Sequence, residues 1–147
     1  MTNGKPDITI YTDGACDPNP GPGGWGAIIC AAGSEVKLSG HERDTTNNRM
    51  EMTAAIKALK SLEKPSKVTL YTDSEYLKNG ITKWLPNWIA RNWKTSTRRP
   101  VKNQDLWKKL ISAEKRHEVT WSWLRGHAGN RMNNRVDRLA RSAIRRR

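Results

Sequence analysis

The sequence predicts an α/β fold in which a single mixed β-sheet is flanked by helices. Two strand-like segments, "ITIYTD" at residues 8–13 and "VTLYTD" at residues 68–73, are nearly identical, and each ends on an aspartate. A strongly periodic helical segment lies between them. A strand–helix–strand crossover normally makes its two strands parallel members of one sheet, whereas short links after the first strand favour antiparallel pairing.

Three strands joined by short links are expected at the start of the chain. Residues 7–13 alternate in polarity and are rich in β-branched and aromatic side chains, which is typical of a strand. The Pro/Gly-rich segment 17–26 predicts a turn that ends it. Two further strands, connected by a tight turn at Gly33-Ser34, are expected at residues 25–33 and 35–42. Such an arrangement is an antiparallel meander.

The helix between the two similar strands is expected over residues 45–64. Its apolar side chains recur at helical spacing, at Met52, Ala55, Ile56, Leu59 and Leu62. The side-chain oxygen of Thr45, Thr46 or Asn47 can cap the first turn by accepting a backbone N–H bond. Pro65 ends the helix, because proline cannot continue the hydrogen-bond pattern.

The second half of the chain is expected to hold more helices and two strands. A fourth strand covers residues 67–72; Ser74 can cap the helix that follows, and Pro86 opens a second short helix. Residues 94–103 form a basic loop. A helix, a strand and a C-terminal helix with an apolar stripe follow at residues 104–116, 117–126 and 130–147. Because no linker divides the chain, one domain over residues 1–147 is expected.

Composition and charge limit the class of protein. The 147 residues carry a formal net charge of +13, which favours a polyanionic partner, with nucleic acid ahead of an acidic membrane surface. The longest apolar stretches are only a few residues, so a transmembrane span is excluded, and "MTNGKPD" is too polar for a signal peptide. The two thiols, Cys16 and Cys30, lack CxxC spacing. A reduced, cytoplasmic setting is therefore expected.

Four acidic residues are candidates for one site. Parallel strands would bring Asp13 and Asp73 to the same carboxyl edge, where open α/β sheets usually keep their sites. Two carboxylates in register repel each other unless a cation lies between them, and Mg²⁺ prefers carboxylate oxygens. Glu51 lies on the helix side that carries small alanines, and Asp137 borders the apolar stripe of the last helix. Both can therefore join the pair.

Each acid also has an ordinary structural interpretation. An aspartate after a strand is commonly a turn former or a helix cap. Glu51 could be a first-turn acid that the helix dipole favours. Asp137 could form an ion pair with Arg135 or Arg141. Convergence of all four acids in space is what would favour the metal site.

Five blocks of the sequence resemble, in the order of the family, bacterial-type ribonuclease H1 of the type 1 ribonuclease H family: "TDGACDPNPGPGGWG", "TTNNRMEMTAAIKAL", "YTDSEYLKNGITKW", "WKTSTRRPVKNQDLW" and "LRGHAGNRMNNRVDRLAR". The blocks cover nearly the whole chain. The resemblance implies a ribonuclease H-like fold, in which a five-stranded mixed sheet has three antiparallel and two parallel strands with helices on both faces. It also implies an endonuclease that cuts the RNA strand of RNA–DNA hybrids by a two-metal-ion mechanism and leaves 5′-phosphate and 3′-hydroxyl ends.

The resemblance assigns the catalytic carboxylates to Asp13, Glu51, Asp73 and Asp137. It implies that these carboxylates also bind two Mg²⁺ ions, with Mn²⁺ as an alternative. The mobile histidine of the family's "GHAG" loop becomes His127. Imidazole titrates near neutrality, so His127 could move protons or help to release product; otherwise it is an ordinary loop histidine. His41 and His117 have no such context and are expected to be surface residues.

Substrate contacts follow from the same resemblance. Asn19, Asn47 and Asn48 would touch the minor groove, where RNA displays its 2′-hydroxyl. Their alternative roles are helix capping and turn formation. The family also grips one phosphate of the DNA strand in a small polar pocket. The matching positions are Thr46 and Asn103, with Arg43 as the third after a one-residue shift.

The segment "KWLPNWIARNWKT" matches the family's basic protrusion, which tracks the DNA strand. Trp84 and Trp88 would meet deoxyribose, and the cations that would meet phosphates are Lys83, Arg91 and Lys94. The two tryptophans could instead be core residues, because their spacing is i,i+4. Of Trp84, Trp88 and Trp93, one or two are expected to pack and at least one is expected to be exposed.

The chain departs from the family pattern near the last carboxylate. Arg131-Met132-Asn133-Asn134 stands where the family typically has Pro-Glu-x-Glu, and Arg138 replaces a common acid. The smaller negative charge near Asp137 should weaken the binding of metal ions and strengthen the binding of the RNA–DNA hybrid. Glu75 replaces an amide and could face RNA or lie near a metal.

The expected partner is an RNA–DNA hybrid. The protein is expected to be a monomer that binds no membrane and needs no protein partner. No separate hybrid-binding domain is expected, and the basic C-terminal segment could partly substitute for one. Two other interpretations compete with the nuclease. A noncatalytic hybrid-binding module would lack a metal carboxylate. An integrase or resolvase would lack the tryptophan protrusion and the asparagines.

Overall fold

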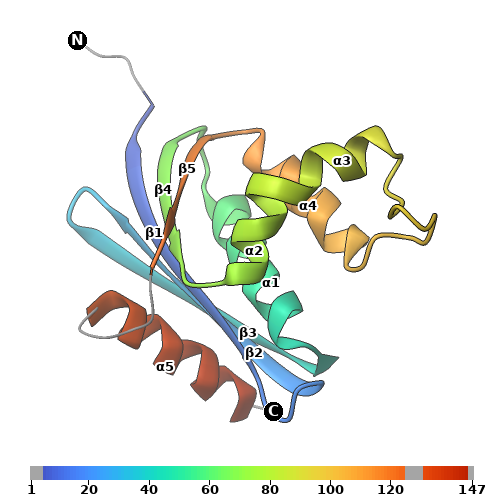
Figure 1. Ribbon diagram of the computed structural model, residues 1–147. Coiled ribbons are helices and arrows are strands. Elements are labelled where there is room, and N and C mark those ends of the chain that lie inside the picture. Colours follow the sequence, from blue (N-terminus) through green and yellow to red (C-terminus); the bar gives the residue numbers. More distant parts are fainter. Residues whose placement is uncertain (1–4, 125–130, 146–147) are drawn as a thin grey trace.

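A five-stranded sheet forms the centre of the computed structural model, which describes residues 5–124 and 131–145 (Figure 1). The strand order is β3-β2-β1-β4-β5. The strands are β1 Asp7–Cys16, β2 Gly21–Ala31, β3 Ser34–Thr45, β4 Lys67–Thr72 and β5 Glu118–Trp123. The first three strands are antiparallel, β4 lies parallel to β1, and β5 lies parallel to β4. The predicted α/β fold with a mixed sheet is therefore confirmed.

The glycine-rich segment after β1 is a strand over most of its length rather than a turn. β1 continues past Asp13 to Cys16, which pairs with Gly23. The turn is confined to residues 17–20, where the Asp17 amide donates to the Pro22 carbonyl at 3.0 Å. The glycines pair as a strand here because helices pack directly on their backbone, where a side chain would collide. Local turn propensity is thus overridden by tertiary packing.

The helices are α1 Asn47–Ser61, α2 Glu75–Asn79, α3 Leu85–Ala90, α4 Gln104–Glu114 and α5 Arg131–Arg145, and a π-helical segment, η1 Gly80–Trp84, joins α2 to α3. Thr46 caps α1, since its Oγ1 accepts from the Arg49 amide at 3.2 Å. Pro86 opens a second short helix, α3, as the sequence predicts. It lies in the first turn of α3, where the missing N–H breaks no helical hydrogen bond.

Helices cover both faces of the sheet, as predicted (Figure 1). On one face α1 packs on β1 and β2, with α4 beside it, and the shared core includes Ile10, Leu59, Leu70 and Trp107. On the other face α5 lies across β1 and β2 and buries Val136, Ala140 and Ala143. Among the helices described here, none has the length and apolar composition needed to cross a bilayer.

His117 is buried, with 8% of its surface exposed, so the prediction of a surface residue is wrong. Its Nδ1 accepts from the Ser66 amide at 3.0 Å, and its Nε2 lies 3.2 Å from the Leu59 carbonyl, to which the neutral ring donates. The imidazole thus joins the end of α1 to the segments that precede β4 and β5. Burial lowers the pKa of His117 from its ordinary value of 6.5. No sequence motif marks this role.

The stability of the protein should therefore depend on His117 in mild acid. A lowered folded-state pKa means that the unfolded chain binds the proton first, so this contribution is present above about pH 6.5 and is lost as the pH falls. We expect His117→Asn, which keeps an acceptor for the Ser66 amide, to be about 1 kcal/mol less stable at pH 8. Urea denaturation from pH 8 to pH 5 should show the two proteins converging in acid, whereas a constant gap would contradict this role.

Candidate active site

Gly14 brings helix α1 against the end of β1. A side chain at Gly14 would collide with the backbone of Met50 and Glu51. The small residues on this side of α1, including Ala54 and Ala58, are fully buried, as expected for close helix–sheet packing. The carboxyl group of Glu51 therefore reaches the one on Asp13, the residue before the glycine.

Asp73 arrives from the neighbouring parallel strand. The register pairs Tyr11 with Tyr71, so Asp13 and Asp73 follow at the same level of the sheet. Carboxylate oxygens of Asp13, Glu51 and Asp73 all lie within 4.8 Å of one another. The structure thus brings together three of the four predicted carboxylates from β1, α1 and the end of β4.

Asp137 reaches the same cluster from α5. Gly26 pairs with Asp13 in the sheet, and a Cβ at Gly26 would lie 2.9 Å from the Leu139 side chain, so the missing side chain lets α5 approach. Asp137 shares a hydrogen bond with Asp13 and also accepts from Arg141, with Nε–Oδ2 at 3.1 Å. The ion pair is therefore present. Among the described acids, the group whose ligand atoms all lie within 4.8 Å of one another does not include Asp137, so its role as a metal ligand stays a prediction.

Burial and mutual repulsion disfavour negative charge in this cluster. Burial, the hydrogen bond with Asp137 and the charges of Asp73 and Asp137 raise the pKa of Asp13 to about 8, although the Gly14 amide donates to its Oδ1 at 2.9 Å. Burial, followed by the charges of Asp13 and Asp73, also raises the pKa of Glu51 well above its ordinary value. Glu51 is the fifth residue of α1, so the first-turn helix-dipole interpretation does not apply to it.

The acidic cluster fits a divalent cation. Glu51 is only 5% exposed, and within the described residues its buried Oε1 has no hydrogen-bond partner. An acceptor buried in this way normally has a donor or a cation beside it. Mg²⁺ takes oxygen ligands of this kind. His127, the other predicted catalytic residue, lies outside the described residues.

The three predicted groove-reading asparagines lie at or beside the start of α1. Asn19 projects from the β1–β2 turn, and its Oδ1 accepts from the Asn47 backbone amide at 3.1 Å. Asn48, in the first turn of α1, is exposed. Helix capping by Asn19 is thus present in the structure, and contact of the three residues with RNA stays a prediction.

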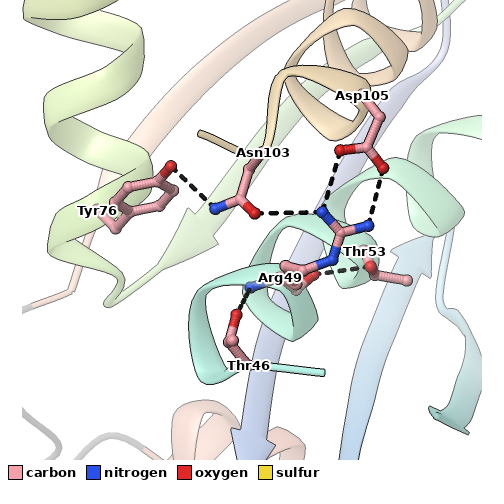
Figure 2. A network of polar contacts seen from close by, with 6 residues as sticks. All are labelled: Thr46, Arg49, Thr53, Tyr76, Asn103 and Asp105. Carbon is pink, nitrogen blue, oxygen red and sulfur yellow. Dashed lines mark hydrogen bonds and ion pairs between the residues drawn. The ribbon is translucent and has the colours of Figure 1, made fainter. Parts of the chain in front are cut away.

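A polar network joins two of the residues assigned to the DNA-phosphate pocket (Figure 2). The backbone amide of Arg49 donates to Thr46 Oγ1, and the Arg49 side chain donates through Nη1 to Asn103 Oδ1 at 3.2 Å. Asp105 holds the same guanidinium with two bonds of 3.0 and 2.8 Å. On its far side Asn103 donates to Tyr76 Oη at 3.1 Å. These bonds fix the orientation of the Asn103 amide.

Arg49 is the member of this network that the sequence interpretation did not name. The pattern match selected Arg43, which lies on β3 and is exposed, whereas Arg49 contacts Asn103 directly. The available signal was spacing: Arg49 follows Thr46 by three residues, which places both at the same end of α1. Its link to Asn103, 54 residues away, exists only in the folded chain.

The tryptophans of the protrusion are all half-buried, so the prediction that at least one is exposed is wrong. The physical reason is that the rings cover one another. Trp88 lies 5.6 Å from Trp84, 6.4 Å from Trp93 and 5.5 Å from Trp107, measured between ring centroids. The predicted phosphate-binding cations are exposed around them, at Lys83, Arg91 and Lys94. An open basic hollow of about 520 Å³ is lined by Arg91, Lys94, Thr95, Ser96 and Arg98.

Glu75 stands apart from the acidic cluster. It is exposed in the first turn of α2, where the helix dipole favours a negative side chain. Among the described acids, the group whose ligand atoms lie within 4.8 Å of one another contains Asp13, Glu51 and Asp73 but not Glu75.

A mixed sheet in this strand order, with buried carboxylates gathered at one edge, defines a nuclease of the ribonuclease H-like class. The RNase H family model matches residues 5–145. The chain is 56% identical over 138 residues to ribonuclease H of Hydrogenovibrio crunogenus, covering 94% of this chain and 95% of that protein. It is 58% identical over 137 residues to ribonuclease H of Nitrosococcus oceani, covering 93% of each.

A solved structure agrees. LC9-RNase H1, described as a type 1 RNase H with the type 2 active-site motif, superposes with a TM-score of 0.85 at 31% identity, covering 98% of this chain and 74% of that one. The chain therefore belongs to the ribonuclease H family, and it is an enzyme of the nuclease class.

Proposed function

We propose that this protein cleaves the RNA strand of RNA–DNA hybrids endonucleolytically, leaving 5′-phosphate and 3′-hydroxyl ends. The observation that carries the proposal is the acidic cluster: in a chain of this family, the carboxylate oxygens of Asp13, Glu51 and Asp73 lie within 4.8 Å of one another, and Asp137 is hydrogen-bonded to Asp13. A noncatalytic binding module has no need to bury so many acids together.

The four carboxylates would hold two Mg²⁺ ions, with Mn²⁺ as an alternative. When bound, the ions supply activation of a water molecule and stabilisation of the departing 3′ oxygen. The chain itself positions the ligands: the Gly14 amide orients Asp13, close packing of α1 holds Glu51, and the ion pair with Arg141 orients Asp137. His127 would move protons or help product to leave.

Selection of the hybrid would come from two groups of residues. Asn19, Asn47 and Asn48, at the start of α1, would read the 2′-hydroxyl of RNA in the minor groove. Thr46 and Asn103, with Arg49 and the predicted Arg43, would grip a phosphate of the DNA strand, and the basic protrusion would follow that strand. We further propose that the protein acts as a single-domain monomer in the cytoplasm, where its two cysteines stay reduced.

One assay tests the activity. The protein is incubated with an RNA–DNA hybrid labelled on either strand, with Mg²⁺ or with EDTA, beside RNA–RNA and DNA–DNA duplexes. We expect cleavage of the RNA strand of the hybrid alone, only with the metal, and products that polynucleotide kinase phosphorylates only after phosphatase treatment. Cleavage of the DNA strand, or cleavage with EDTA, would overturn the proposal.

The polar network of Figure 2 makes a prediction about which arginine grips the DNA strand. Arg49→Ala should raise KM for the hybrid by about tenfold or more with little change in kcat, because it removes a charge-assisted contact worth about 1.5–3 kcal/mol. The matched Arg43→Ala removes an exposed cation and should have the smaller effect. A larger KM increase for Arg43→Ala would return the phosphate contact to Arg43.

A further inference from the structure

A second group of cations lies away from the acidic cluster, between α5 and β3. An open hollow of about 280 Å³ there is lined by Ile28, Lys37, Arg135, Arg138, Leu139 and Ser142. Ile28 and Lys37 are register partners on β2 and β3, so both side chains point to the sheet face that α5 covers. The remaining lining residues come from α5 itself.

Positive charge exceeds negative charge around this hollow. Glu35 holds Arg135 with two bonds of 2.8 and 2.7 Å, and Lys37 and Arg131 also act on Glu35. Arg138 also lines the hollow, so its described lining residues include three cations, Lys37, Arg135 and Arg138, and no acid. Arginines three and four residues apart on a helix repel one another, and a polyanion on this surface would relieve that repulsion.

The side chains that line the hollow have the chemistry of a nucleic-acid backbone contact. Leu139, which is half-buried, supplies an apolar surface for a sugar ring above the buried Ile28, while the exposed Ser142 supplies a hydroxyl donor. Lys37 and Arg138 supply the cations for phosphate oxygens. A free anion would need the cations alone, so the combination favours a sugar–phosphate chain.

The position of the hollow suits a duplex held at the acidic cluster. Leu139 packs over Gly26, which is the register partner of Asp13. Counted from Asp13, Lys37 lies two strands away across the sheet and two residues further along the strand direction. Strand spacing and rise put the backbone of Lys37 about 12 Å from that of Asp13. That distance corresponds to roughly four base pairs along a duplex, at about 3.4 Å each.

We propose that the α5–β3 surface, formed by Lys37, Arg135, Arg138 and Ser142, is a second backbone-binding site that grips the hybrid beyond the segment being cut. The inference rests on the proposed function, because it takes the hybrid as the ligand of the acidic cluster. It assigns a role to Arg138, which stands where the family commonly has an acid.

The test compares two pairs of charge-neutralising substitutions. Lys37→Gln/Arg138→Gln removes two cations from the α5–β3 surface, and Lys57→Gln/Lys60→Gln removes two exposed cations from α1 as a control of equal net charge. Binding of a fluorescent hybrid is measured by anisotropy in EDTA at several salt concentrations, with one hybrid long enough to reach both sites and one that ends at the cleaved segment.

For the long hybrid we expect the slope of log K against log salt to fall by about 1.5–2 in the surface variant and to stay near the wild-type value in the control. The short hybrid should bind all three proteins alike. Equal slopes for the two variants on the long hybrid would overturn the inference, because the surface would then act only through net charge. Thermal unfolding of each variant checks that the fold is intact.

Cleavage kinetics separate this inference from the proposed function. Lys37→Gln, two strands from the acidic cluster, should raise KM for the long hybrid severalfold and leave kcat near the wild-type value. If the wild-type protein binds the hybrid but does not cut it, the proposed function is contradicted. The salt dependence of binding then still tests whether the α5–β3 surface binds the hybrid. If the wild-type protein cuts the hybrid and Lys37→Gln has the wild-type KM, only the proposal of a second binding site on the α5–β3 surface is contradicted.

Discussion

Replacing Asp13 with asparagine is expected to abolish cleavage of an RNA–DNA hybrid while the hybrid still binds. Asp13 is the central acid of the cluster, within reach of Glu51 and Asp73 and hydrogen-bonded to Asp137. The amide keeps the size of the carboxylate but loses the negative charge that a divalent cation needs. Loss of several kcal/mol of transition-state stabilisation corresponds to about a 10³-fold fall in kcat or more.

The control for Asp13→Asn is Asp17→Asn, which changes an exposed acid in the turn that follows the same strand. Single-turnover cleavage gives the rate, and anisotropy in EDTA gives the affinity. We expect the control to cut at the wild-type rate and both variants to bind. If Asp13→Asn cuts as fast as the wild type, the assignment of the metal ligands is wrong.

Glu51→Gln should stabilise the protein when divalent cations are removed. The buried Glu51 Oε1 has no hydrogen-bond partner among the described residues, and the negative charges of Asp13 and Asp73 act on the same carboxyl group. Replacing this carboxyl with a neutral amide removes the cost of a buried negative charge beside two other acids. The gain is about 1–3 kcal/mol, which corresponds to a rise in Tm of several degrees. Differential scanning fluorimetry in EDTA at pH 8 measures it.

The pH dependence of this effect has a fixed sign. A raised folded-state pKa makes the folded protein hold its proton longer than the unfolded chain, so stability is full below the ordinary Glu pKa of 4.5 and falls as the pH rises. The gap between Glu51→Gln and wild type should therefore open from pH 5 to pH 8. Added Mg²⁺ should raise the Tm of the wild type more than that of the variant.

Glu63→Gln, an exposed acid beyond the end of α1, is the control for general charge effects. The Tm of Glu63→Gln should equal that of the wild type at every pH. A Glu51→Gln variant that melts below the wild type in EDTA at pH 8 would show that the carboxylate is well paired without a cation.

Much of the fold follows from local patterns in the chain. The similar segments 8–13 and 68–73, with a capped periodic helix between them, predicted the parallel β1–β4 pair, and the structure has it. The same rule predicted that Asp13 and Asp73 would meet. Chain patterns failed where packing opposed local propensity, as in the glycine-rich start of β2.

The functional surfaces divide in the same way. Motif matches selected Asp13, Glu51 and Asp73, which the structure brings together, and they selected Thr46 and Asn103, which one network joins. They missed Arg49, whose partners Asn103 and Asp105 lie more than fifty residues away, and they misjudged the mutual shielding of the tryptophans. Both depend on contacts between distant segments.

The sequence by itself determined the strand and helix order, the strong positive charge and the acids available for a metal site, because each of these depends on residue type and short-range spacing. Only the tertiary structure decided that Gly14 and Gly26 admit α1 and α5 close to the sheet edge where Asp13, Glu51 and Asp73 meet, that His117 is buried, and that Lys37 and Arg138 line one hollow. The reason is that side chains from separate elements acquire their neighbours, and hence their pKa values and partners, only when those elements pack.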